Sequence, residues 1–249
     1  MGKNKLKKFA EMEQLDCVYQ YPFATLRQEG GCPLKGRWAA DVFGNSNPIT
    51  LELGCGKGEY AVGMGRLYPD RNFIGIDIKG ARMWTGARQA ADEGLDNVKF
   101  LRTSIDLLPH FFAPGEVAEI WITFPDPQMK KVNKRLTGTH FLDIYRQVLT
   151  PDATIRLKTD SPFLYAYTTA MIEANSLPLL AATPCLYESE YASQVPPITT
   201  YYEQQWLSRG IPSKYVAWQL PPDVALTEPD VEIEPDTYRS FGRGELQGF

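Results

Sequence analysis

Short apolar runs alternate with longer amphipathic segments through the middle of the chain. Five runs of apolar and β-branched residues read as strands buried on both faces, at residues 49–53, 73–78, 98–101, 119–124 and 154–158. Apolar residues at helical spacing predict helices over 59–67, 79–93, 139–149 and 162–175. The alternation predicts an α/β fold with a parallel sheet and helices on both faces.

The pattern changes after residue 176. Residues 179–187 and 215–220 predict two further strands, separated by a proline-containing loop and a short helix over 202–209. A hairpin-like pair at the end of a parallel sheet adds an antiparallel strand. We therefore expect a Rossmann-like sheet of seven strands, mostly parallel, with a terminal antiparallel strand.

The length and the charge pattern predict three parts. The 249 residues fit one large domain with extensions. We expect a basic N-terminal extension (1–46), a catalytic domain (47–221) and an acidic C-terminal tail (222–249). The extension begins with Lys3, Lys5, Lys7 and Lys8, and no acid lies among them. The tail has seven acids against two bases and few core-forming residues, so we expect it to be peripheral or partly disordered.

The net charge of −4 argues against a uniformly basic nucleic-acid binder. The tail alone carries −5, however, which leaves +1 for residues 1–221. The bases of that part concentrate at residues 3–8 and 130–135. A nucleic-acid partner bound through a narrow basic footprint is therefore compatible with the overall acidity.

Other classes of protein are excluded more directly. No run of 18 or more apolar residues exists to span a membrane. The first residues lack the apolar stretch and cleavage site of a secretory signal, so we expect a cytoplasmic protein. The four cysteines have no paired spacing, which predicts neither a disulfide framework nor a zinc site, and we expect no metal. The sequence leaves monomer and homodimer open.

A glycine-rich loop follows the first predicted strand and opens a helix. Open α/β sheets bind their ligands at this place. Gly54, Gly56 and Gly58 alternate with other residues, which lets the backbone approach a ligand, and the helix N-terminus favours an anionic group. Glu52 would complement a cationic part of that ligand. A tight turn is the alternative interpretation of the glycines alone.

Polar residues end the next two strands beside the same crevice. Asp77 follows the second strand, where a carboxylate can accept both hydroxyls of a ribose. Thr103 and Ser104 end the third strand, within reach of an adenine amino group. A ligand with a ribose, a carboxylate and an ammonium fits this set better than a pyrophosphate does. S-adenosylmethionine has all three groups and is the predicted cofactor.

The fourth strand ends in an acid held between two prolines. Pro125 and Pro127 fix the backbone around Asp126, so this carboxylate is held in one extended conformation. An ordinary surface loop is the alternative. The basic residues that follow are Lys130, Lys131, Lys134 and Arg135. A charge run is usually a solvated face, but this one lies at the cofactor edge of the sheet, where it can bind nucleic-acid phosphates.

Together these motifs resemble the bacterial tRNA (guanine-N7)-methyltransferase family, over roughly residues 5–220. Its most specific piece is the segment 124–127 (Phe-Pro-Asp-Pro), followed by Lys130 and the Lys134-Arg135 pair. Two further motifs follow along the chain in the same order as in the family. They are Lys158-Thr159-Asp160 and the element that ends in Thr200-Tyr201-Tyr202-Glu203.

The resemblance implies a class I methyltransferase fold, with S-adenosylmethionine as methyl donor and tRNA as substrate. The implied product is 7-methylguanosine in the tRNA variable loop, at position 46 in tRNA numbering. It implies a cofactor site with Glu52, Asp77, Ser104 and Asp126, and a tRNA guanosine touched by Lys130, Asp160, Thr200 and Glu203. Guanine N7 has an in-plane lone pair, so we expect Asp126 to stabilise the growing positive charge rather than to remove a proton.

The chain departs from the family pattern at several positions. Gln128 replaces a tryptophan, Leu136 replaces an arginine, and the basic stretch is one residue shorter. Asp77 stands where glutamate is usual and Ser104 where an acid is common. Two alternatives stay open: a class I methyltransferase with another substrate, and an RNA-binding scaffold without catalysis.

Overall fold

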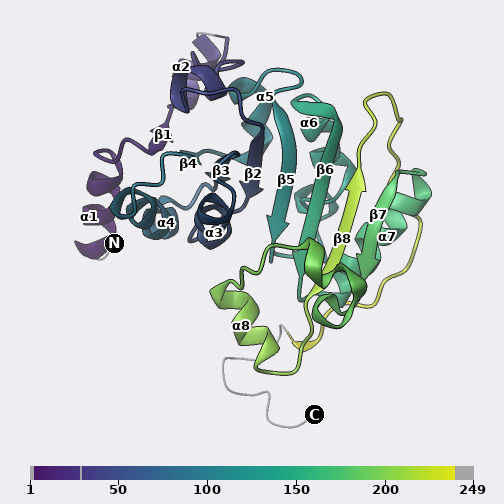
Figure 1. Cartoon of the computed structure of the whole chain (residues 1–249). Coiled ribbons are helices and arrows are strands. Elements are labelled where there is room, and N and C mark those ends of the chain that lie inside the picture. The colour runs from purple at the N-terminus through teal and green to yellow at the C-terminus, as the bar shows by residue number, and fades with distance from the viewer. Residues whose placement is uncertain (1–2, 29, 239–249) are drawn as a thin grey trace.

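The computed structural model describes residues 3–28 and 30–238 of the chain. In this part, eight strands form one sheet in the order β1-β4-β3-β2-β5-β6-β8-β7 (Figure 1). The strands are β1 (Val18–Gln20), β2 (Ile49–Leu53), β3 (Asn72–Ile76), β4 (Val98–Arg102), β5 (Val117–Thr123), β6 (Leu149–Thr159), β7 (Leu179–Thr183) and β8 (Lys214–Gln219). β8 runs antiparallel to both of its neighbours, and the other pairs are parallel.

The predicted α/β class and the terminal antiparallel strand are confirmed, but the sheet has eight strands instead of seven. The additional strand is β1, which pairs in parallel with residues 100–102 of β4. Three residues are too few to produce a recognisable apolar pattern, so β1 depends on its partner strand. The last strand also lies inside the sheet, between β6 and β7.

The helices surround this sheet. They are α1 (Lys3–Met12), α2 (Phe23–Gln28), α3 (Glu59–Leu67), α4 (Gly80–Asp92), α5 (Leu108–Phe111), α6 (Thr139–Tyr145), α7 (Pro162–Ala174) and α8 (Tyr201–Leu207). Single helical turns occur at Trp38–Val42, Ile105–Leu107, Val132–Lys134, Leu186–Glu188 and Glu190–Gln194. α7 begins as predicted, because Ser161 Oγ accepts a hydrogen bond from the Leu164 amide at 2.9 Å and Pro162 follows the cap.

Two apolar cores lie on the two faces of the sheet. One core packs side chains such as Leu51 and Ile120 against α5, α6 and α7. The other packs Phe73 and Trp121 against α1, α3 and α4. Because side chains alternate along a strand, Glu52 points away from the first core and toward α3, where the Ala61 amide donates to it.

The residues before position 47 belong to this same structure. They supply β1, and Trp38 is fully buried in the core with its indole N–H donating to the Phe111 carbonyl. Met12 is fully buried in the core that includes α4. The predicted basic extension therefore contributes to the sheet and to both cores. The side chains of residues 3–5 lie outside the described residues.

The tail is packed rather than peripheral between residues 222 and 238. Glu228 accepts hydrogen bonds from Thr139 at the start of α6 and from the Tyr167 hydroxyl. Asp236 is buried and accepts from Ser161 Oγ at 2.5 Å and from the Phe163 amide at 3.0 Å. These acids meet the N-terminal ends of two helices, where a negative charge is stabilised. Residues 239–249 lie outside the described part.

The strand order places the ligand crevice. From β2 the chain moves outward through β3 to β4, and then crosses back to β5 on the other side of β2. The connections that follow β2 and β5 therefore diverge, which opens a crevice at the carboxyl ends of these strands.

Candidate active site

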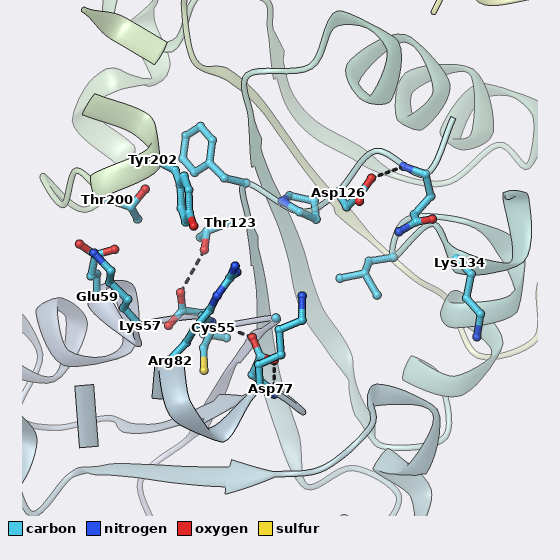
Figure 2. A pocket seen from close by; sticks show the side chains of 18 residues that line it. Cys55, Lys57, Glu59, Asp77, Arg82, Thr123, Asp126, Lys134, Thr200 and Tyr202 are labelled. Atoms are coloured by element: carbon cyan, nitrogen blue, oxygen red, sulfur yellow. Dashed lines mark hydrogen bonds between the residues drawn. The ribbon is translucent and has the colours of Figure 1, made fainter. Parts of the chain in front are cut away.

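A pocket of about 490 Å³ occupies this crevice (Figure 2). Its wall comes from the glycine loop after β2, the start of α4, the turn after β5 and the start of α8. The segments that the sequence motifs singled out separately thus meet in one place. Of the predicted cofactor residues, Glu52, Gly54, Gly56, Asp77 and Asp126 all line it.

The glycine loop needs its glycines for conformation. Gly54, Gly56 and Gly58 have φ values of 71°, 56° and 70°, which side chains rarely adopt. At Gly58 a Cβ would also come within 2.4 Å of the Phe100 ring, so this glycine permits close packing below the loop. At Gly54 and Gly56 a Cβ would meet nothing closer than 3.8 Å, so the loop exposes backbone to the pocket.

Glu52 forms the buried floor of the pocket. Its carboxylate accepts hydrogen bonds from the Ala61 amide at 2.8 Å and from Thr123 Oγ1 at 3.0 Å. Burial raises the pKa of Glu52 from 4.5 to about 8, and these two hydrogen bonds only partly offset that effect. The group is therefore mostly protonated at neutral pH, until a cation approaches it.

Asp77 connects the glycine loop with the start of α4. Its Oδ2 accepts from the Gly56 amide at 2.9 Å and its Oδ1 from the Lys79 amide at 2.7 Å. Asp77 also lines a second, adjoining pocket of about 160 Å³, together with the predicted residues Thr103 and Ser104. The two pockets share three residues, so an elongated ligand can extend from one into the other.

The second pocket contains an acid that the sequence motifs did not indicate. Ser104 Oγ donates to Asp106 at 2.8 Å, and His140 Nε2 lies 3.0 Å from the other oxygen of Asp106. Burial would raise the pKa of Asp106, but the hydrogen bonds from His140 and Ser104 outweigh it and lower that pKa. A carboxylate therefore lines this pocket, although Ser104 stands where an acid is usual.

Asp126 is exposed on a strained turn at the pocket wall. The flanking residues Phe124 and Gln128 have φ values of 49° and 48° although neither is glycine. The Phe124 amide donates to the Lys158 carbonyl at 2.8 Å, and the Gln128 amide donates to Asp126 Oδ1 at 3.0 Å. Backbone strain of this kind costs about 1–3 kcal/mol per residue and clusters at functional sites. The hydrogen bond from the Gln128 amide holds one carboxylate oxygen, and the turn lines the pocket.

The basic loop after this turn contains both exposed and buried basic residues. Lys130 and Lys134 are exposed, and Lys134 lines both pockets. Arg135 is buried: its guanidinium donates to the carbonyls of Gln128 and Met129 and lies over the rings of Phe163 and Tyr167. The guanidinium is therefore not exposed for the predicted contact with tRNA: its donors bond the loop's own carbonyls, and its ring contacts join the loop to α7.

The carboxylate of Glu203, which we predicted to touch the tRNA guanosine, is instead bound by other residues of the protein. It is fully buried, pairs with buried Lys158 at 2.9 Å, and accepts from Tyr187 and Ser213. It also completes a capping box with Thr200 at the start of α8. Thr200 lines the pocket, whereas the carboxylate of Glu203 is occupied within the protein. Sequence spacing identifies the capping box but not the burial of the pair.

Asp160 is likewise enclosed. It is 1% exposed, and its carboxylate accepts a hydrogen bond from the hydroxyl of Tyr238, a residue of the tail, at 2.6 Å. The predicted contact with a tRNA guanosine is not available in this conformation. The sequence could not reveal this, because Tyr238 is 78 residues away.

Several pocket residues were not predicted. Lys57, Lys79, Arg82 and Tyr202 line the pocket beside the predicted set. Lys57 Nζ lies 4.0 Å from the centroid of the Tyr201 ring, which joins the glycine loop to α8. Lys57 lies in the glycine loop and Tyr202 in the motif that ends in Glu203, so the sequence could have indicated both as pocket residues. Arg82 lies in no motif, and nothing in the sequence indicated it.

Comparisons with known proteins agree with this geometry. Residues 46–215 match a family model described as "Putative methyltransferase". A tRNA (guanine-N(7)-)-methyltransferase from Bacteroides thetaiotaomicron is 54% identical over 248 residues, which covers 100% of this chain and 98% of the relative. One from Porphyromonas gingivalis is 60% identical over 93% of this chain and 96% of its own length.

The chain belongs to the tRNA (guanine-N(7)-)-methyltransferase family. The similarity extends to more distant members, such as that of Bacillus subtilis at 36% identity over 72% of this chain and 83% of the relative. The predicted family is confirmed.

The fold of this family member is shared with methyltransferases of known structure. The crystal structure of the 16S rRNA methyltransferase KamB aligns with a TM-score of 0.55 at 17% identity, over 82% of this chain and 96% of that one. An antibiotic-related methyltransferase aligns with a TM-score of 0.54 at 16% identity, over 72% and 90%. The predicted class I methyltransferase fold is confirmed.

The described residues contain neither a cluster of metal-ligating side chains nor a membrane-spanning helix. In residues 3–28 and 30–238, no three His, Cys, Asp or Glu side chains gather in a way that could hold a metal ion. No helix in the same ranges is both long and apolar enough to cross a membrane.

Proposed function

We propose that this protein transfers the methyl group of S-adenosylmethionine to N7 of a guanosine in tRNA, in the variable loop at position 46. The observation that carries the proposal is a single pocket in which an acidic floor meets the strained Asp126 turn and an exposed basic loop. The relatives named for this reaction, at up to 60% identity, support it. Since tRNA is a cytoplasmic substrate, we propose the cytoplasm as the location.

The chemistry of the pocket fits the proposed cofactor. The backbone of Gly54 and Gly56 and the N-terminus of α3 would receive its carboxylate, and Glu52 would complement its ammonium. Asp77 would accept the ribose hydroxyls, while Thr103, Ser104 and Asp106 would surround the adenine in the adjoining pocket. When bound, the cofactor supplies a sulfonium methyl as the electrophile.

The protein's part in the reaction is alignment and electrostatics. Guanine N7 needs no deprotonation, so holding it in line with the methyl group is the main task, and good alignment is worth ~7–11 kcal/mol. Asp126 lines the pocket wall, and the Gln128 amide holds one of its carboxylate oxygens. A carboxylate there stabilises the positive charge that develops on the methylated base.

Methylation of a defined tRNA tests the proposal. Purified protein is incubated with radiolabelled S-adenosylmethionine and an unmodified tRNA transcript, and the labelled nucleotide is mapped by borohydride and aniline cleavage at 7-methylguanosine. We expect one cleavage site at position 46 and no labelling of a transcript with adenosine there. Label on another nucleotide, or no label at all, would refute the assignment.

A further inference from the structure

With the exceptions of the half-buried Lys57 and the exposed Asp126, acidic and basic residues are separated by depth in the main pocket. The buried or half-buried acids Glu52, Glu59 and Asp77 line its inner part. The exposed bases Lys79, Arg82 and Lys134 line its outer part and come from different segments. The pocket thus has an acidic interior and a basic rim.

The basic rim does not match the proposed cofactor. S-adenosylmethionine carries two positive groups and one carboxylate, so its net charge is positive and suits the acidic interior. Among the described residues, Lys79, Arg82 and Lys134 have no acid within ion-pair distance. Unpaired cations gathered at the mouth of a pocket instead favour a polyanion.

Arg82 comes from a segment far from the predicted basic loop in sequence. It stands in the first turn of α4, and Figure 2 shows it and Lys134 on opposite sides of the pocket. Helix α1 packs at the same end of α4, since a Cβ on Gly80 would come within 2.8 Å of the Phe9 ring. The exposed Lys7 on that helix pairs with Glu11 at 3.7 Å and is not part of the pocket wall. The basic residues on the two sides of the pocket are therefore Arg82 and Lys79 on one side and Lys134 on the other.

We propose that Arg82, with Lys79 beside it, binds a tRNA phosphate across the pocket from Lys134. The tRNA backbone would then cross the pocket with one phosphate contact on each side. The base of the target guanosine can enter the pocket between these two contacts. This inference rests on the proposed function and adds to it a second phosphate site that the sequence motifs did not indicate. The guanidinium suits this role because its donors match phosphate oxygens in pairs.

The salt dependence of tRNA binding tests this site. One lost phosphate contact reduces the slope of log affinity against log salt by about 0.7–0.9, which equals ~6-fold weaker binding near 0.1 M salt. We expect Arg82→Ala to show both effects, measured by fluorescence anisotropy with labelled tRNA. Arg82→Ala with Lys134→Ala should show about twice the change in slope, because the two contacts lie apart.

Arg88→Ala is the matched control. Arg88 is an exposed arginine on the same helix, paired with Asp92 at 2.9 Å and absent from the pocket wall. We expect it to leave tRNA affinity and slope unchanged. Thermal unfolding of both variants checks that neither effect comes from lost stability, and calorimetry with S-adenosylmethionine checks the cofactor site.

The outcomes separate the two proposals. If the wild-type protein methylates tRNA but Arg82→Ala binds it with the wild-type slope, the second phosphate site is refuted. If Arg82→Ala instead weakens cofactor binding at an unchanged slope, Arg82 belongs to the cofactor site and the inference is also refuted. If the wild-type protein methylates no tRNA, the proposed function fails, and this inference fails with it.

Discussion

Asp126 illustrates how one residue combines local and tertiary constraints. The two prolines beside it restrict its backbone, and this much is visible in the sequence. The positive φ of Phe124 and Gln128 depends on contacts made after folding, such as the bond from the Phe124 amide to β6. The carboxylate is therefore held more firmly than its exposed position suggests.

Replacing Asp126 by alanine should lower kcat while binding of the cofactor changes little. Removing one preorganised electrostatic group costs about 10²–10³-fold in rate. Methyl incorporation under saturating tRNA measures kcat, and calorimetry measures cofactor affinity. Asp143→Ala, an exposed acid paired with Arg146, is the control and should keep full activity. Near-normal turnover of Asp126→Ala would remove it from the catalytic role.

Glu52 should make cofactor binding depend on pH. Its pKa of about 8 means that the folded protein holds a proton there at neutral pH, and an ammonium bound beside it favours the ionised form. Affinity for S-adenosylmethionine should therefore rise from about pH 6 toward about pH 8, and it should fall again where the cofactor's ammonium loses its proton. Because the pKa of Glu52 is raised from 4.5 to about 8, its contribution to the unfolding free energy is fully present below pH 4.5 and decreases as the pH rises to about 8.

Calorimetry in two buffers of different ionisation enthalpy measures the proton released on binding. The cofactor's own amino group titrates in a similar range, so the comparison is with Glu52→Gln. Glutamine cannot ionise, so we expect this variant to release no proton from position 52. The proton release and the pH dependence that remain would come from the cofactor's amino group. Equal proton release in both proteins would contradict a contact between Glu52 and the ammonium.

At the scale of elements, one buried ion pair connects β6 with α8. Lys158 and Glu203 are both fully buried, and Lys158 Nζ also donates to the Ile198 carbonyl just before α8. Burial lowers the pKa of Lys158, and the charge of Glu203 and the hydrogen bond to it partly offset this. The pair fixes the start of α8, and with it Thr200 and Tyr202 at the pocket.

Breaking this pair should destabilise the protein strongly. Glu203→Ala leaves a buried ammonium without its partner, which typically costs ~3–5 kcal/mol. The double variant Lys158→Met with Glu203→Leu removes both charges and should recover much of that loss. Urea unfolding measures both, with exposed Glu173→Ala as control. A double variant as unstable as Glu203→Ala would mean that lost packing, and not the unpaired charge, sets the cost.

At the scale of the whole molecule, the tail closes the structure around α6 and α7. Its acids account for the overall negative charge, yet two of them, Glu228 and Asp236, bind the N-terminal ends of helices. Tyr238 covers Asp160 at the end of β6. The tail therefore stabilises the side of the sheet opposite α3 and α4, and it packs beside the basic loop, where the Asp236 amide donates to Met129 Sδ.

Asp236→Ala should lower the unfolding free energy by ~1–3 kcal/mol. The substitution leaves the buried Phe163 amide without its acceptor and removes the partner of Ser161 Oγ. Asp230, which is exposed in the same segment and forms no hydrogen bond or ion pair within the described residues, provides the control through Asp230→Ala. Thermal unfolding of the two variants measures the difference. Equal midpoints would show that the tail contact does not stabilise the fold.

The sequence by itself determined the strand–helix alternation, the glycine loop, the position of Asp126 between two prolines and the family. These features depend on neighbouring residues, because periodicity, proline geometry and motif spacing act over a few positions. It also predicted correctly that Glu52, Asp77 and Asp126 meet, since the carboxyl ends of parallel strands share one edge of the sheet.

Only the tertiary structure decided which polar residues remain free to act. Arg135, Asp160 and Glu203 belong to the most specific motifs, yet each is buried against partners from other segments. Arg82 belongs to no motif, yet it lines the pocket. The reason is physical: whether a charged side chain is desolvated and paired depends on residues far away in sequence, and local spacing does not contain that information.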